Sequence, residues 1–91
     1  MPYLLYYSRQ AVNDWDILKK QGNPSLLIRA QRLLDQLREN PYSSYPPYKK
    51  LNGELNGLYA RRLNIQHRLV YQVFEDPKAV KIVSMWTHYG D

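Results

Sequence analysis

The sequence predicts an α+β fold in which a helical hairpin packs on one face of a small antiparallel sheet. Two patterns carry this prediction. Residues 8–40 carry apolar side chains at helical spacing, in two segments. The other apolar segments are short, and short links between the later ones favour antiparallel hairpins. The expected order is β-α-α-β-β-β, and the 91 residues leave room for one domain, residues 1–91.

Residues 2–8 form the first apolar segment. Leucine and tyrosine lie on both of its faces, which is typical of a buried strand. Ser8 is a good N-cap for the helix that follows. Ala11, Trp15 and Leu18 then recur at i, i+4 and i+7, so we expect one apolar helix face.

The first helix is expected to end at Gly22, because glycine readily takes the left-handed conformation of a C′ residue. Asn23-Pro24 supplies an N-cap and a proline at the first position of a second helix. Leucine and alanine continue at helical spacing from there to Asn40-Pro41, which ends the helix.

Proline, tyrosine and glycine mark the middle of the chain as a connection. Residues 41–47 read PYSSYPP, and two Asn-Gly turns follow. Asp76-Pro77 is a turn signal between two later apolar segments. Strands are expected over residues 58–65, 68–75 and 79–87.

Thirteen Lys and Arg residues against eight Asp and Glu give a net charge of +5. This balance favours nucleic acid, an anionic membrane surface or an acidic protein as partner. Nine tyrosines can stack on bases or contact phosphates. Cysteine is absent, which excludes a disulfide framework and a thiol nucleophile. The sequence contains neither an export signal nor the ~20 apolar residues of a membrane helix, so we expect a cytoplasmic protein.

Most of the positive charge lies between residues 49 and 68. Five basic residues there are opposed by one acidic residue, Glu54. Because the strands over 58–65 and 68–75 are expected to be hairpin neighbours, basic side chains of both can share the sheet face without helices. The five are Lys49, Lys50, Arg61, Arg62 and Arg68.

The residue types narrow the chemistry. With two histidines, no carboxylate cluster beside either and no Gly-rich phosphate loop, we expect no metal site and no cofactor. Arginine, lysine, histidine and tyrosine are sufficient for RNA cleavage without a metal. The substrate's 2′-hydroxyl attacks, arginine stabilises charge on the phosphoryl oxygens, and histidine protonates the leaving 5′-oxygen. A solvated basic face without catalysis is the alternative.

Three runs of the sequence resemble the Txe/YoeB toxins of the RelE superfamily. They are LNGLYARR at 55–62, HRLVY at 67–71 and MWTHY at 85–89. The N-terminal half agrees too, in Ser8, Ala11 and the leucine-rich second helix. The resemblance implies a RelE-like fold and the toxin half of a bacterial type II toxin–antitoxin pair.

Toxins of this family are endoribonucleases that enter the ribosomal A site and cleave mRNA there without a metal. The resemblance therefore implies mRNA, the ribosome with its ribosomal RNA, and a cognate YefM-like antitoxin with an acidic segment as partners. Operator DNA is implied only through the antitoxin complex. A homodimer is common in the family, and no membrane is implied.

The resemblance also assigns roles to residues. Arg68 matches the arginine that stabilises the phosphoryl transition state, and His88 matches the general acid. Tyr89 matches the tyrosine that positions or stacks on the substrate. The residues expected to contact RNA are Lys50, Tyr59, Arg61 and Arg62, with at least one arginine of the pair on phosphate.

Lys49 departs from the family pattern, which has a glutamate as general base in a Tyr-Glu-Lys-Leu run. This chain reads Tyr48-Lys49-Lys50-Leu51. Lys49 can be the base if the positive charges around it favour its neutral amine, or Glu54 can take that role. Alternatively the chain is a catalytically weak RNA- or antitoxin-binding module or corepressor. A gyrase poison on the same fold is a further alternative, against which the terminal His88 argues.

Overall fold

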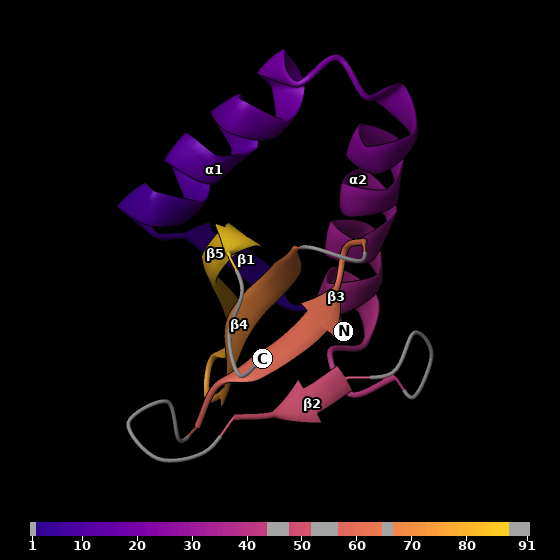
Figure 1. Cartoon of the computed structure of the whole chain (residues 1–91). Coiled ribbons are helices and arrows are strands. Elements are labelled where there is room, and N and C mark those ends of the chain that lie inside the picture. Colours follow the sequence, from indigo (N-terminus) through magenta and orange to yellow (C-terminus); the bar gives the residue numbers. More distant parts are fainter. Residues whose placement is uncertain (1, 44–47, 52–56, 65–66, 88–91) are drawn as a thin grey trace.

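Two helices cover one face of a five-stranded sheet, as Figure 1 shows. The computed structural model describes residues 2–43, 48–51, 57–64 and 67–87. No helix in these ranges is long and apolar enough to cross a membrane. This arrangement confirms the predicted α+β class. The elements are β1 (Leu4–Tyr7), α1 (Arg9–Lys20), α2 (Pro24–Glu39), β2 (Tyr48–Lys50), β3 (Tyr59–Arg62), β4 (Arg68–Glu75) and β5 (Lys78–Thr87).

The signals that begin and end the helices are confirmed. The Ser8 hydroxyl accepts a hydrogen bond of 3.0 Å from the backbone N–H of Ala11, at the start of α1. The Asn23 side chain likewise accepts from the N–H of Leu26, with Pro24 in the first turn of α2. Gly22 follows α1 with φ of +69°, a conformation that favours glycine.

The sheet is antiparallel except at one edge. Its strand order is β1-β5-β4-β3-β2, and β1 runs parallel to β5. The expectation of a wholly antiparallel sheet is therefore wrong for β1. The helical hairpin takes the chain from β1 to β2 at the opposite edge of the sheet, and the antiparallel strands β2 to β5 then return to β1. The long connection that a parallel pair requires therefore includes both helices and three strands.

Strand β2 occupies part of the segment for which the sequence indicates a turn-rich connection. Its three residues pair with β3, Tyr48 opposite Arg61 and Lys50 opposite Tyr59. Three residues are too few to display an alternating pattern, so the strand has no signal of its own in the sequence. It forms the second edge of the sheet.

Strand β1 is an exposed edge strand, and the prediction of a buried one is wrong. Leu4 is 57% exposed and Tyr6 is 53% exposed. Both belong to the sheet face that the helices do not cover, whereas Tyr3 is buried in the core against the helices. Burial of an edge strand depends on tertiary neighbours, which hydrophobicity alone does not reveal.

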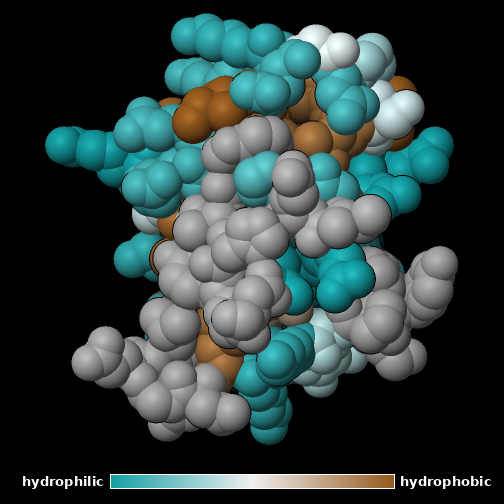
Figure 2. All heavy atoms as spheres, in the orientation of Figure 1, coloured by the Kyte–Doolittle hydropathy of each residue, from teal (hydrophilic) through white to brown (hydrophobic). Residues whose placement is uncertain are grey.

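Apolar side chains form two clusters, one on each side of the sheet. The larger lies between sheet and helices and includes Leu18, Leu37, Leu69 and Ile82. Figure 2 shows hydrophobic side chains between the two helices near the top of the view. The smaller cluster, on the other side, has Leu51, Ala60 and Val70 at its centre.

Candidate nucleic-acid interface

The strand register brings three predicted site residues onto one sheet face. Residues directly opposite each other in neighbouring strands share a face, as do alternate residues of one strand. Lys49 lies opposite Ala60, and Arg62 lies opposite Arg68. We call the face that carries Lys49, Ala60, Arg62 and Arg68 the outer face, because it is turned away from α1 and α2.

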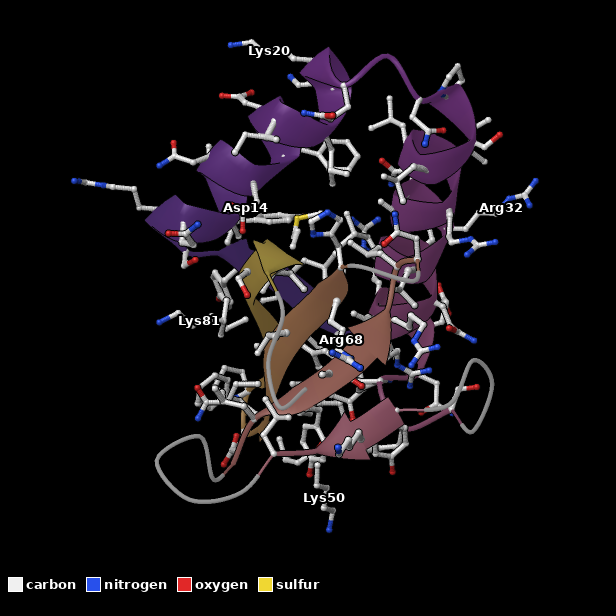
Figure 3. All side chains as sticks on the ribbon, in the orientation of Figure 1. Asp14, Lys20, Arg32, Lys50, Arg68 and Lys81 are labelled. Atoms are coloured by element: carbon white, nitrogen blue, oxygen red, sulfur yellow. The ribbon has the colours of Figure 1, made fainter. Side chains whose placement is uncertain are left out.

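Arg68 is the first residue of β4, the central strand of the sheet. It is opposite Arg62 on β3 and opposite Thr87 on β5, so the end of β5 runs beside it. Figure 3 shows Arg68 near the centre of the sheet, in front of β3 and β4. Like charges directly opposite each other destabilise a sheet. An anion bound over Arg62 and Arg68 would offset that repulsion.

The small apolar cluster packs beside the basic residues of the outer face. Leu51, Ala60 and Val70 are 5%, 3% and 0% exposed. Ala60 lies opposite Lys49 and two residues before Arg62 on β3. Because these neighbours are packed, the backbones that carry the basic side chains are held in a defined register.

Lys50 and Tyr59 do not belong to the outer face. They are opposite each other in β2 and β3, on the side that faces the helices. Tyr59 stacks on Tyr71 at 5.7 Å between ring centroids and meets Tyr48 edge-on at 5.5 Å. In Figure 3 Lys50 extends from β2 away from Arg68. Tyr59 therefore packs within the domain, and the structure does not bring Lys50 and Tyr59 together with Arg68. Their contact with RNA stays a prediction.

Arg61 is buried, with 1% of its surface exposed. Its guanidinium donates to the Tyr71 hydroxyl at 3.0 Å and to the carbonyls of Pro41 and Ser43 at 2.9 Å each. It also lies 5.1 Å from the ring centroid of Tyr48. The prediction that at least one arginine of the pair contacts RNA stays a prediction. Arg61 is enclosed within the domain, and Arg62 is the exposed member of the pair.

These contacts give Arg61 a positioning role for the site. Its guanidinium joins the segment after α2, through Pro41 and Ser43, to strands β3 and β4. Its contact with the Tyr48 ring reaches the residue that precedes Lys49. Arg61 thus holds β2, and with it Lys49, against the rest of the sheet.

Asp14 is a buried polar residue that was not among the predicted site residues. It is 1% exposed, and its carboxylate accepts from the backbone N–H of Met85 at 2.8 Å and from the amide of Gln10. The hydrogen bond from Met85 joins α1 to β5, two residues before Thr87 at the end of the strand. A signal existed, because Asp14 falls between Ala11 and Leu18 on the apolar helix face.

A second polar cluster lies at the far end of the sheet, beside the turn between β4 and β5. Glu75 accepts hydrogen bonds from the hydroxyls of Tyr3 and Tyr42. The Tyr42 hydrogen bond holds the pKa of the Glu75 carboxyl below its usual value. Burial and the bond to Glu75 raise the pKa of Tyr42. Burial also raises the pKa of Tyr71, which Arg61 partly offsets.

His88, Tyr89 and Glu54 lie outside the residues that the structure describes. Their predicted roles as acid, substrate-positioning residue and alternative base therefore stay predictions. Thr87, the register partner of Arg68, directly precedes His88 in the sequence.

Comparison with known families gives one match over nearly the whole chain. Residues 7–89 match a family described as the YoeB-like toxin of bacterial type II toxin–antitoxin systems. A protein of Mycobacterium bovis named Toxin YoeB is 38% identical over 48 residues, which are 53% of this chain and 56% of that protein. The aligned region thus spans little more than half of that relative.

Two solved structures from Staphylococcus aureus resemble the whole domain. One, a YoeB–YefM complex, is 31% identical with a TM-score of 0.77, and the match covers 98% of this chain and all of that one. The other, a YoeB dimer, is 30% identical with a TM-score of 0.80 and the same coverage. The likeness includes sequence as well as fold.

Proposed function

Because the chain belongs to the YoeB-like toxins of bacterial type II toxin–antitoxin systems, in the RelE superfamily, we propose that it is a ribosome-dependent endoribonuclease. It cleaves mRNA in the ribosomal A site. One observation carries the proposal: the register gathers Lys49, Arg62 and Arg68 on the outer face, beside the strand end that precedes His88.

The substrate supplies the nucleophile of the proposed reaction. Its 2′-oxygen loses a proton to a base and attacks the adjacent phosphorus, while the bond from phosphorus to the 5′-oxygen breaks. Arg68 stabilises the charge on the phosphoryl oxygens, because guanidinium keeps its charge and can bind two of them at once. His88 protonates the leaving 5′-oxygen. Tyr89 holds the substrate nucleotide by stacking.

Lys49 is the proposed base. A lysine can accept the 2′-hydroxyl proton only as the neutral amine. Its place on the same face as Arg68 supports this role, since both reactive positions of the phosphodiester then meet side chains of one surface. Glu54 is the second choice for the base.

We further propose that an acidic, YefM-like antitoxin covers the outer face and that the toxin can form a homodimer. The two S. aureus structures described above hold a YoeB–YefM complex and a YoeB dimer. The net charge of +5 and the basic outer face support an acidic partner. Binding there would exclude mRNA from the same arginines.

Expression of the chain tests the proposed site. The parent should arrest growth, and Arg68→Ala or His88→Ala should abolish the arrest while the variant still accumulates as folded protein. Phe74→Ala, which changes an exposed residue remote from Arg68 on β4, serves as the control. Retention of full toxicity by both site variants would show that the assigned site is wrong.

Mapping of mRNA 5′ ends in a translating extract tests Lys49. If Lys49 is the base, Lys49→Ala should reduce cleavage at every site, and Lys49→Glu should restore it because a carboxylate accepts protons. Equal cleavage by parent and Lys49→Ala would remove Lys49 from the mechanism. Antitoxin binding without any cuts by the parent would favour the catalytically weak binding module instead.

A further inference from the structure

A groove of about 750 Å³ runs along one side of α2, apart from the residues assigned to the reaction. Six of its lining residues recur at helical spacing on α2, from Ser25 to Gln36, and the seventh is Arg62 of β3. The groove therefore lies where α2 meets the end of β3.

Among the residues that the structure describes, three arginines line this groove, and neither Asp nor Glu does. Arg29 and Arg32 come from α2, one turn apart, and Arg62 comes from β3. The Arg29 guanidinium donates to the carbonyl of Leu63 at 3.0 Å, which fixes its position against the sheet. Arg32 is exposed, and Figure 3 shows it extending outward from α2.

Arg62 connects the groove to the outer face. It lines the groove, and it is also the cross-strand partner of Arg68. Guanidinium groups thus follow one another from Arg68 across Arg62 to Arg29 and Arg32. A continuous row of cations of this kind matches an extended polyanion better than a single small anion.

We propose that this groove binds the phosphate backbone of the RNA strand beyond the nucleotide that is cleaved on the outer face. The inference rests on the proposed function, since that function puts RNA on Arg68. Arginine suits the task because its planar fork binds phosphate in two places.

The lining favours RNA over an acidic helix of a protein partner. A helix in a groove is held by several apolar anchors one turn apart. Of the described lining residues, two have aliphatic side chains, Ile28 and Leu33. Leu33 is 4% exposed, so Ile28 is the one accessible anchor among them. Phosphate contacts require no apolar anchor.

The test measures binding of a short 2′-O-methyl RNA to the full chain by fluorescence anisotropy over a salt series. This RNA has no free 2′-hydroxyl, so binding is separated from cleavage. Arg32→Ala should weaken binding and reduce the slope of log K against log salt by about 0.7, the value for one phosphate contact to a single strand. The control is Arg38→Ala, which removes an exposed arginine of the same helix outside the groove.

Equal binding by Arg32→Ala and Arg38→Ala would overturn the proposal. So would a loss of affinity for poly-glutamate in Arg32→Ala with RNA affinity unchanged, because the groove would then be a site for acidic protein. If Arg32→Ala weakens RNA binding but Arg68→Ala leaves mRNA cleavage intact, the groove stands and the proposed reaction site fails.

Discussion

Arg61 and Arg62 are neighbours on β3 with opposite surroundings. Arg61 is enclosed by tyrosine rings and backbone carbonyls on the helix side, whereas Arg62 is exposed, on the outer face with Arg68 and at the α2 groove. The strand's alternation separates them. One arginine therefore builds the platform, and the other is available to a phosphate.

The same contrast extends to the whole sheet. The helix side uses its polar groups internally, as in the bonds of Arg61 to Pro41 and of Asp14 to Met85. The outer face instead carries Arg62 directly opposite Arg68. A domain of this size can thus have a rigid interior and a charged working face one residue apart.

The largest expected effect comes from exchanging the two arginines separately for methionine. Arg61→Met should destabilise the fold by about 3 kcal/mol, because the Pro41 and Ser43 carbonyls and the Tyr71 hydroxyl lose a charged donor. Arg62→Met should change the free energy of unfolding by no more than about 0.5 kcal/mol. Urea denaturation measures both.

For RNA binding we expect the opposite order: Arg62→Met should lose more affinity than Arg61→Met when each variant is assayed under conditions in which it is folded. Arg62→Met should bind the 2′-O-methyl RNA more weakly than the parent. Arg61→Lys is a further control that separates the charge of Arg61 from its hydrogen bonds. Lysine keeps the positive charge but cannot reach the Tyr71 hydroxyl and the carbonyls of Pro41 and Ser43 at once. Equal destabilisation by Arg61→Met and Arg62→Met would contradict the inference that Arg61 stabilises the fold whereas Arg62 does not.

Asp14 offers a second, smaller test of the interior. Asp14→Ala should cost about 2 kcal/mol, because the Met85 N–H stays buried without its acceptor. Asp16→Ala, two residues further along α1, removes the exposed ion pair with Lys19 at 3.4 Å and should cost no more than about 0.5 kcal/mol. Thermal unfolding of the two variants provides the measurement.

Asp14→Asn refines this test, because its amide oxygen can still accept from Met85. It should lose less stability than Asp14→Ala. If all three variants melted together with the parent, the anchoring of α1 to β5 by Asp14 would be refuted.

Sequence reasoning succeeded where structure depends on neighbours in the chain. The Ser8 and Asn23 caps and the Gly22 terminus were predictable because each acts on residues within one turn. It failed where burial depends on distant segments. The exposure of β1 follows from packing that no local pattern specifies.

The candidate site divides in the same way. Alternation along β3 was predictable and separates Arg61 from Arg62, but which of them faces the helices was not. The orientation of Arg61 depends on Pro41, Ser43 and Tyr71. These residues lie 10 to 20 positions away in the sequence and accept hydrogen bonds from its guanidinium.

The smallest expected effect concerns Glu75, where polar contacts are exposed rather than enclosed. The hydrogen bond from Tyr42 holds the pKa of Glu75 below its usual 4.5 in the folded state. The stability that this bond contributes is therefore present above pH 4.5 and is lost as the pH falls through the lowered pKa.

Tyr42→Phe should melt slightly below the parent at neutral pH, and the difference should shrink as the medium is acidified below pH 4.5. The Glu75→Gln variant should show a weaker acid dependence than the parent. A melting difference between Tyr42→Phe and the parent that stays constant through that acid range would mean that the charge of Glu75 contributes nothing to stability through its hydrogen bond with Tyr42.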